Sequence, residues 1–159
     1  MAIDPGLSLK KSSAKNNSRQ SAAVGVASFS LETLSGLDGL QVHDIVMQGI
    51  SVSLARNVVR SFAVITPSEI RTVLGVSEKT LRRRADTTLD ANASDRVLRL
   101  LSVAEQATAV LGDRDVAERW LTARAIGLDR RRPIELLTSS EGTTMVKTLL
   151  TRMECGVYS

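Results

Sequence analysis

The stretch Thr66–Arg84, TPSEIRTVLGVSEKTLRRR, decides the fold of this 159-residue chain. Thr66 and Glu69 have the spacing of a capping box, in which each residue satisfies a backbone N–H of the other at a helix start. Gly75 is typical of the left-handed residue that ends a helix, and Ser77 is typical of the residue that caps the next one. The stretch therefore predicts two short helices joined by a tight turn, which is the pattern of a helix-turn-helix motif.

The second helix of this pair carries the polar and basic face that a DNA-reading helix needs. We expect it to run from Glu78 to about residue 85, with Leu81 facing inward. The residues expected to contact DNA are Ser77, Lys79, Thr80, Arg82, Arg83 and Arg84. A guanidinium fork matches O6 and N7 of guanine, so Arg82 or Arg83 is expected to read a base. The same pattern also fits a plain corner of two helices with a solvated cationic surface.

One position departs from the usual two-helix pattern. The fifth position of that pattern, four residues before Gly75, normally holds a small residue that lets the two helices pack closely. Here the residue is Arg71. This departure keeps open a third interpretation, in which the motif no longer binds DNA and the chain is a protein adaptor.

The distribution of charge favours an anionic partner for the motif. The chain has a net charge of +4 and a pI of about 9.7. Residues 51–84 contain seven basic and two acidic residues, whereas residues 95–159 contain ten basic and nine acidic ones. The surplus lies on the two-helix motif, where neutralisation of DNA phosphates would need it.

The composition also excludes several classes of protein. A hydrophobic content of 43% with only 3% aromatic residues suits an aliphatic helical core. No run is long enough for a membrane helix and no secretory signal is visible, so we expect a cytoplasmic protein without a membrane partner. His43 and Cys155 are the only histidine and cysteine. We therefore expect no disulfide, no metal site, no cofactor and no catalytic residues.

The N-terminal part of the chain is expected to form a basic tail and then a four-helix module. Residues 1–40 are rich in Ser, Ala and Asn and predict a mostly disordered tail, with a short packing segment over residues 29–40. Residues 41–86 predict a DNA-binding module. It comprises a helix over residues 42–48, a helix capped by Ser51 and the two-helix motif.

The rest of the chain, residues 90–159, predicts a second helical module. We expect a polar joint over residues 86–94 and a long helix over about residues 93–111, followed by a helix that Asp113 caps. The apolar face expected for that helix comprises Val116, Ala117, Trp120 and Leu121. Pro133 then begins a short helix, and Ser139 or Ser140 caps the last helix. The sequence thus predicts an all-α fold of two modules without strands.

Short elements of the second module occur in an order that resembles a known family. They are Ser94–Leu100, Leu111–Asp113, Ala117–Leu121, Leu128, Arg132–Leu137, Glu141–Gly142, Val146, Leu149–Leu150 and Cys155–Tyr158. This order resembles the C-terminal toxin-binding domain of the Xre/MbcA/ParS-like antitoxins. Thr80–Arg84 resembles a motif in that family's N-terminal domain, so the resemblance covers about residues 42–159.

The resemblance implies a function that depends on binding and not on catalysis. Such antitoxins form all-helical homodimers, block a co-encoded RES-domain toxin whose substrate is NAD⁺, and repress their own operon. In the family, the C-terminal helix and tail lie over the active-site cleft of the toxin. The residues to which this analogy assigns toxin contact are Arg152, Glu154, Val157, Tyr158 and Ser159.

Two departures bear on those contacts. Cys155 stands where relatives carry an aromatic residue, and Ala125–Gly127 replaces the turn expected after the Trp120 helix. Tyr158 could equally be a frayed terminal aromatic residue, and Arg130, Arg131 and Arg132 could face toxin, DNA or solvent. An alternative function is a stand-alone dimeric helix-turn-helix regulator, in which the second module only dimerises.

Overall fold

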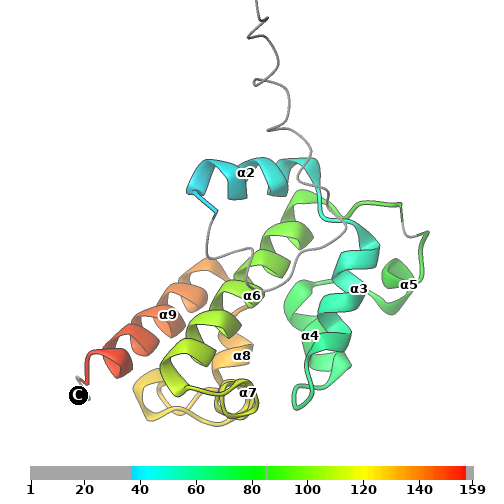
Figure 1. Ribbon diagram of the computed structural model, residues 1–159. Coiled ribbons are helices and arrows are strands. Elements are labelled where there is room, and N and C mark those ends of the chain that lie inside the picture. The colour runs from blue at the N-terminus through cyan, green and yellow to red at the C-terminus, as the bar shows by residue number, and fades with distance from the viewer. Residues whose placement is uncertain (1–36, 85, 157–159) are drawn as a thin grey trace, which may run out of the picture.

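The computed structural model of the chain describes residues 37–84 and 86–156, and these residues form helices without a strand. Their order is shown in Figure 1. The elements are α2 (Gly39–Gln48), α3 (Val52–Ser61), α4 (Pro67–Leu74), α5 (Glu78–Leu81), α6 (Ala91–Leu111), α7 (Arg114–Thr122), the 3₁₀ helix η1 (Ile126–Leu128), α8 (Pro133–Leu136) and α9 (Ser140–Glu154). The predicted all-α fold is confirmed.

The ends of the helices in the two-helix motif form as predicted. The Thr66 hydroxyl accepts the N–H of Glu69, and the Glu69 carboxylate accepts the N–H of Thr66 at 3.2 Å. Gly75 ends α4 in the left-handed conformation, with a φ of 67°. The Ser77 hydroxyl accepts the N–H of Thr80 at 3.0 Å and so begins α5. The helix-turn-helix geometry is therefore encoded locally.

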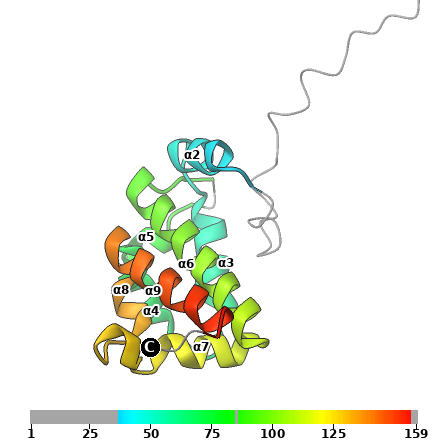
Figure 2. The ribbon, with the colours of Figure 1, turned by 90° about the vertical axis from the view of Figure 1, so that its left-hand side faces the viewer.

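The long helix α6 is the centre of the fold, and α2, α4, α7 and α9 pack around it (Figures 1 and 2). Val97, Leu98 and Leu101 form an apolar stripe at helical spacing, and they are buried. Leu100 and Val103, which lie off that stripe, are also fully buried. A helix surrounded by other helices buries more than one face, which a single apolar stripe does not reveal.

The start of α6 corrects the predicted polar joint. Asp90 caps the helix by accepting the N–H of Ala93 at 2.8 Å, so the helix begins at Ala91. Ser94, assigned to the joint, is fully buried, and its hydroxyl accepts the N–H of Ile50 at 2.9 Å. The joint prediction was wrong because a polar side chain can be buried where a backbone group supplies its partner.

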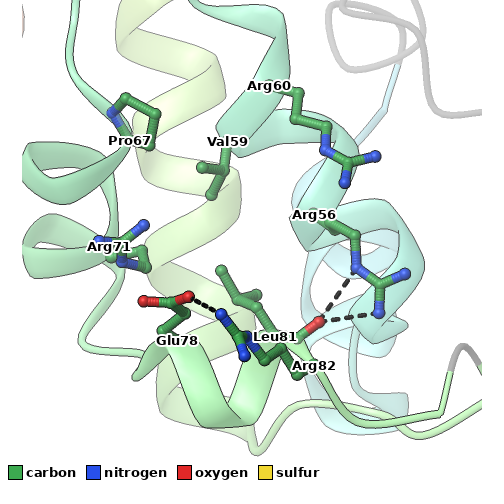
Figure 3. Close-up of a pocket in the computed structure, with 8 residues that line it drawn as sticks. All are labelled: Arg56, Val59, Arg60, Pro67, Arg71, Glu78, Leu81 and Arg82. Atoms are coloured by element: carbon green, nitrogen blue, oxygen red, sulfur yellow. Dashed lines mark hydrogen bonds and ion pairs between the residues drawn. The ribbon is translucent and has the colours of Figure 1, made fainter.

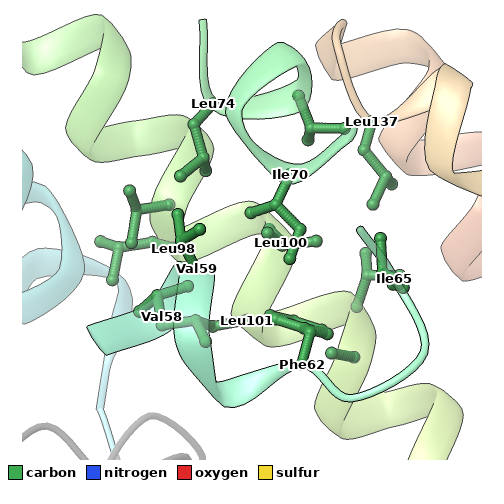
Figure 4. Close-up of a cluster of buried hydrophobic side chains, with 14 of the residues drawn as sticks. Val58, Val59, Phe62, Ile65, Ile70, Leu74, Leu98, Leu100, Leu101 and Leu137 are labelled. Atoms are coloured by element: carbon green, nitrogen blue, oxygen red, sulfur yellow. The ribbon is translucent and has the colours of Figure 1, made fainter. Parts of the chain in front are cut away.

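One continuous core connects both halves of the chain. Figure 4 shows Leu98 and Leu100 of α6 together with Val58 of α3 and Leu137, which follows α8. The same cluster reaches Leu150 of α9. The division into modules over residues 41–86 and 90–159 stays a prediction, because α6 supplies core residues to both.

The first described helix begins earlier than the sequence indicated. Asp38 and Gln41 form a capping box, so α2 starts at Gly39 rather than at residue 42. The partly buried residues Val42 and Ile45 pack against the core. The predicted tail over residues 1–36, with most of the packing segment, lies outside the described residues.

Helix α7 differs from the prediction on its apolar face. Val116, expected inside, is 44% exposed, whereas Glu118 is only 1% exposed. One carboxylate oxygen of Glu118 accepts three backbone N–H groups of the loop before α4, those of Ala63 (2.9 Å), Val64 (2.7 Å) and Ile65 (3.3 Å).

Arg114 balances the charge of this buried carboxylate. Its Nε lies 3.2 Å from the second carboxylate oxygen of Glu118, and its guanidinium stacks 5.0 Å from the ring centroid of Phe62. Arg114 also donates to the Ser61 carbonyl at 3.3 Å. The end of α3 and the start of α4 are therefore fixed to α7 by a network of hydrogen bonds.

Replacing Glu118 tests how much its carboxylate contributes to the stability of the fold. We expect Glu118→Ala to lower the free energy of unfolding by about 3 kcal/mol, because it leaves one buried and two partly buried N–H groups without this acceptor and Arg114 without its partner. Urea unfolding followed by circular dichroism measures the loss. Asp44→Ala, at an exposed position of α2, is the control, and equal stability of the two variants would contradict this role of Glu118.

Candidate DNA and toxin interfaces

The expected DNA-reading helix is shorter than predicted, and a distant arginine explains why. Helix α5 ends at Leu81 rather than near residue 85. Arg56 of α3 donates to the Leu81 carbonyl from Nε (3.0 Å) and Nη2 (2.8 Å), and to the Arg83 carbonyl at 3.1 Å. The Leu81 carbonyl thus has a side-chain donor in place of the N–H that a longer helix would supply. The chain turns at Arg82.

The residues predicted to contact DNA lie on two sides of this single turn. Arg82 lines a groove of about 560 Å³ on one side, where it is paired with Glu78. Thr80 and Arg83 line a second hollow of about 450 Å³ on the other side. The structure therefore brings Thr80 and Arg83 together and separates them from Arg82.

The remaining predicted DNA contacts divide between exposed and engaged groups. Lys79 is exposed beside them. The Ser77 hydroxyl is occupied by the α5 cap and by the Thr80 hydroxyl at 2.9 Å. Arg84 lies 3.7 Å from Asp86, and both side chains are exposed. Of this group, Lys79 and Arg83 are thus the best placed to meet DNA, while the Thr80 hydroxyl shares the hydrogen bond with Ser77.

The groove beside Arg82 contains arginines that sequence reasoning did not assign to the site. Arg56 and Arg60 of α3 and Arg71 of α4 line it together with Arg82 (Figure 3). Two features of the sequence could have indicated it: Arg56 and Arg60 are one helical turn apart, and Arg71 replaces a small packing residue. The sequence puts Arg56 and Arg60 on one stripe of their helix but does not show that Arg71 and Arg82 lie opposite them.

The predicted toxin contacts on α9 do not share one face of the helix. Val146 and Leu150 face the core. Arg152 and Glu154 are both exposed, and two positions correspond to about 200° around an α-helix, so they lie on opposite flanks. Val157, Tyr158 and Ser159 lie outside the described residues. A partner seated on one flank of α9 would therefore meet Arg152 or Glu154, but not both.

The Arg152 flank is the more apolar of the two. Met145 is 48% exposed, and Leu149 and Arg152 follow it at helical spacing. The neighbouring 3₁₀ helix adds Ile126, which is 89% exposed. A Cβ placed on Gly127 would lie 2.8 Å from Leu149 Cδ1, which shows how closely η1 approaches α9. We call Ile126, Met145, Leu149 and Arg152 the α9 flank.

The opposite flank of α9 is occupied by contacts within the protein. Lys147 donates to the Ser102 hydroxyl at 2.7 Å. Gln106 donates to the Thr151 hydroxyl at 3.1 Å. These bonds tie the Glu154 side of α9 to α6 and leave the α9 flank as the more apolar open surface of this helix.

A second polar contact joins the helix-turn-helix to the C-terminal helices. Arg132, at the start of α8, forms an ion pair with Glu69 of α4 and donates from Nε to the Thr122 carbonyl at 2.8 Å. The hydrogen bond from Arg132, followed by that from the Thr66 hydroxyl, holds the pKa of Glu69 below its usual value. Arg132 thus has a structural role, whereas Arg130 and Arg131 are exposed.

This pair predicts a dependence of stability on pH. Because the pKa of Glu69 is lowered by folding, the ionised pair stabilises the protein above the ordinary Glu pKa of about 4.3, and the contribution is lost as pH falls through the lowered pKa. We expect Glu69→Gln to be less stable than the parent at neutral pH and to approach it in acid. Urea unfolding across pH measures this, and a deficit independent of pH would contradict it.

Two further observations restrict the chemistry of the described residues. Within residues 37–84 and 86–156, no group of three or more His, Cys, Asp or Glu side chains could hold a metal ion. In the same part of the chain, no helix is long and apolar enough to span a membrane.

Models of known protein families match both halves of the chain. The antitoxin Xre-like helix-turn-helix domain matches residues 41–102, and the antitoxin Xre/MbcA/ParS C-terminal toxin-binding domain matches residues 106–156. The first match ends inside α6, in agreement with a helix that serves both halves.

Two curated relatives, each named Antitoxin Xre, are similar to the chain. The one from Yersinia enterocolitica is 30% identical over 124 residues, which cover 76% of this chain and 83% of the relative. The one from Pseudomonas putida is 30% identical over 93 residues, which cover 58% of each chain. On these matches, and on the helix-turn-helix and C-terminal helices described above, the chain belongs to the Xre/MbcA/ParS-like antitoxin family.

Proposed function

We propose that this chain is the antitoxin of a type II toxin–antitoxin pair. It binds and blocks the active site of a RES-domain toxin that consumes NAD⁺, and as a homodimer it represses its own operon. The observation that carries the proposal is the match of a toxin-binding domain to residues 106–156 in the same chain as an Xre-like helix-turn-helix domain. The alternative is a stand-alone dimeric transcriptional regulator.

The mechanism of neutralisation is steric. The core residues Val146 and Leu150 fix α9, so the surface it presents is already ordered before the toxin binds, which lowers the entropic cost of association. The α9 flank then seats on the toxin, and the residues after Gly156 enter the cleft that the dinucleotide would occupy. No group of the antitoxin needs to donate or accept a proton.

Repression uses the other end of the molecule. In a homodimer, two copies of α5 would enter successive turns of the major groove, about 34 Å apart. With Arg82 paired to Glu78, Arg83 is the better candidate to reach O6 and N7 of a guanine, with Thr80 beside it. Lys79 would contact phosphate.

The first test measures cellular NAD⁺. We expect NAD⁺ to fall when the neighbouring toxin gene is expressed alone, to recover with the full chain, and to stay low with the chain truncated after Met153. The truncation removes the end of α9 and the tail while leaving the core residues of the helix. An unchanged NAD⁺ level with the neighbouring gene alone would rule out this toxin and favour the stand-alone regulator.

Matched variants in the same assay locate the contact. Met145→Asp places a charge on the α9 flank and is expected to abolish rescue, whereas Val116→Asp, at a similarly exposed site on α7, is expected to rescue fully. Equal rescue by both variants would remove the α9 flank from the interface.

The second test concerns operator binding. We expect Arg83→Ala to weaken binding to a duplex from the chain's own promoter by about 1–3 kcal/mol, because a bidentate contact to a base is lost. Fluorescence anisotropy against promoter and scrambled duplexes measures the change, with Arg119→Ala, at an exposed position of α7, as the control. If Arg83→Ala binds the promoter as the parent does, Arg83 does not read a base.

A further inference from the structure

The groove beside α5 has the chemistry of an anion site. Its volume is about 560 Å³, and it is bounded by α3, α4 and α5. Four arginines and one acid line it, together with three apolar residues (Figure 3). The lining residues are Arg56, Val59, Arg60, Pro67, Arg71, Glu78, Leu81 and Arg82. We call it the Arg71 groove.

The groove lies where the two helices of the motif would otherwise pack closely. Arg71 occupies the position that usually holds a small residue, and α5 makes its main contacts with α3 while α4 packs on α3 and α6. Figure 3 shows Arg71 on one side of the groove and Arg56 and Arg60 on the other. An arginine at the packing position therefore coincides with an opening between α4 and α5.

The cations of the groove differ in what they already bind. Glu78 and Arg82 neutralise each other. Arg56 is held against the carbonyls of Leu81 and Arg83, so its charge is fixed in place. For Arg60 and Arg71, the described part of the chain provides no ion pair within 4.0 Å. The groove thus retains an excess of positive charge.

The shape of this charge favours an extended polyanion. Beyond the groove, Lys79 and Arg83 are exposed, Arg83 on the other side of α5, and Arg84 follows them beside Asp86. A single small anion would use only the groove, whereas a nucleic-acid backbone carries a charge at every nucleotide and would meet both areas.

We propose that the Arg71 groove seats a phosphodiester of the DNA backbone. This anchoring site is separate from the base-reading face of α5, and the inference rests on the DNA-binding part of the proposed function. Arg60 and Arg71 contact the phosphate, and Arg56 contributes a fixed charge. Because α5 is a single turn with few side chains for base edges, backbone contacts from α3 and α4 supply a large share of the affinity.

The proposal predicts a specific salt dependence. Each phosphate that the protein neutralises contributes about −0.9 to the slope of log Kobs against log salt. We expect Arg71→Ala to reduce the magnitude of the slope by about 0.9, and to weaken binding about eightfold more at 0.1 M than at 1 M salt. Arg71→Ala should weaken binding to the promoter and scrambled duplexes equally. Arg83→Ala, in contrast, should weaken mainly the binding to the promoter duplex.

The experiment measures anisotropy titrations of the full chain at several salt concentrations. The variants are Arg71→Ala, Arg71→Lys and Arg60→Ala/Arg71→Ala, with Arg119→Ala as the matched control outside the groove. Arg71→Lys keeps the charge and is expected to keep the slope. Alanine is small and favours helices, so Arg71→Ala is expected to fold, which circular dichroism and the unfolding midpoint verify.

The outcomes separate this inference from the proposed function. If the parent chain binds neither duplex, DNA binding and the groove assignment fall together. If the parent binds and the double variant keeps the parental slope, the groove assignment alone is overturned. Calorimetry with inorganic phosphate alone tests the remaining possibility. Saturable binding with a Kd below about 1 mM, abolished by Arg71→Ala, would identify a site for small anions in place of a site for the DNA backbone.

Discussion

The placement of the helix-turn-helix depends on one buried carboxylate. Glu118 of α7 accepts three consecutive backbone N–H groups of the loop that leads into α4. Without the carboxylate, the buried N–H of Ile65 would lack this acceptor, and without the loop the carboxylate would be a buried charge with fewer donors. The hydrogen bonds between the carboxylate and the loop, together with the ion pair to Arg114, compensate the buried charge and satisfy the backbone donors. The start of the first motif helix is therefore set by a residue from the C-terminal half.

Local chemistry made much of the fold predictable. Capping residues act on backbone groups within a few positions, so their effect can be predicted from the sequence; examples are Thr66, Gly75, Ser77 and Asp113. The structure departs from expectation where a contact crosses the chain. The end of α5 depends on Arg56, 25 positions before Leu81, and Ser94 is buried because Ile50 provides its donor. Neither pairing has a local pattern.

The candidate interfaces were predictable to different degrees. The basic residues of α5 could be assigned because a motif with known geometry carries them, and the residues of the C-terminal tail because a resemblance carries them. The Arg71 groove and the α9 flank could not be assigned, since each is assembled from separate helices or from side chains that periodicity alone would place in the core. Met145 and Leu149, for example, continue the apolar pattern of α9 but lie at its edge.

The shared core has a consequence for how long the protein would act once a protease has attacked it. Because α6 packs against both α4 and α9, removal of α9 would expose part of the same cluster that supports α3 and α4. A cut anywhere in the core would therefore disable both ends of the molecule together. An antitoxin built in this way would lose its hold on the toxin and on the operator at the same time. One cleavage would therefore both free the toxin and allow new antitoxin to be made.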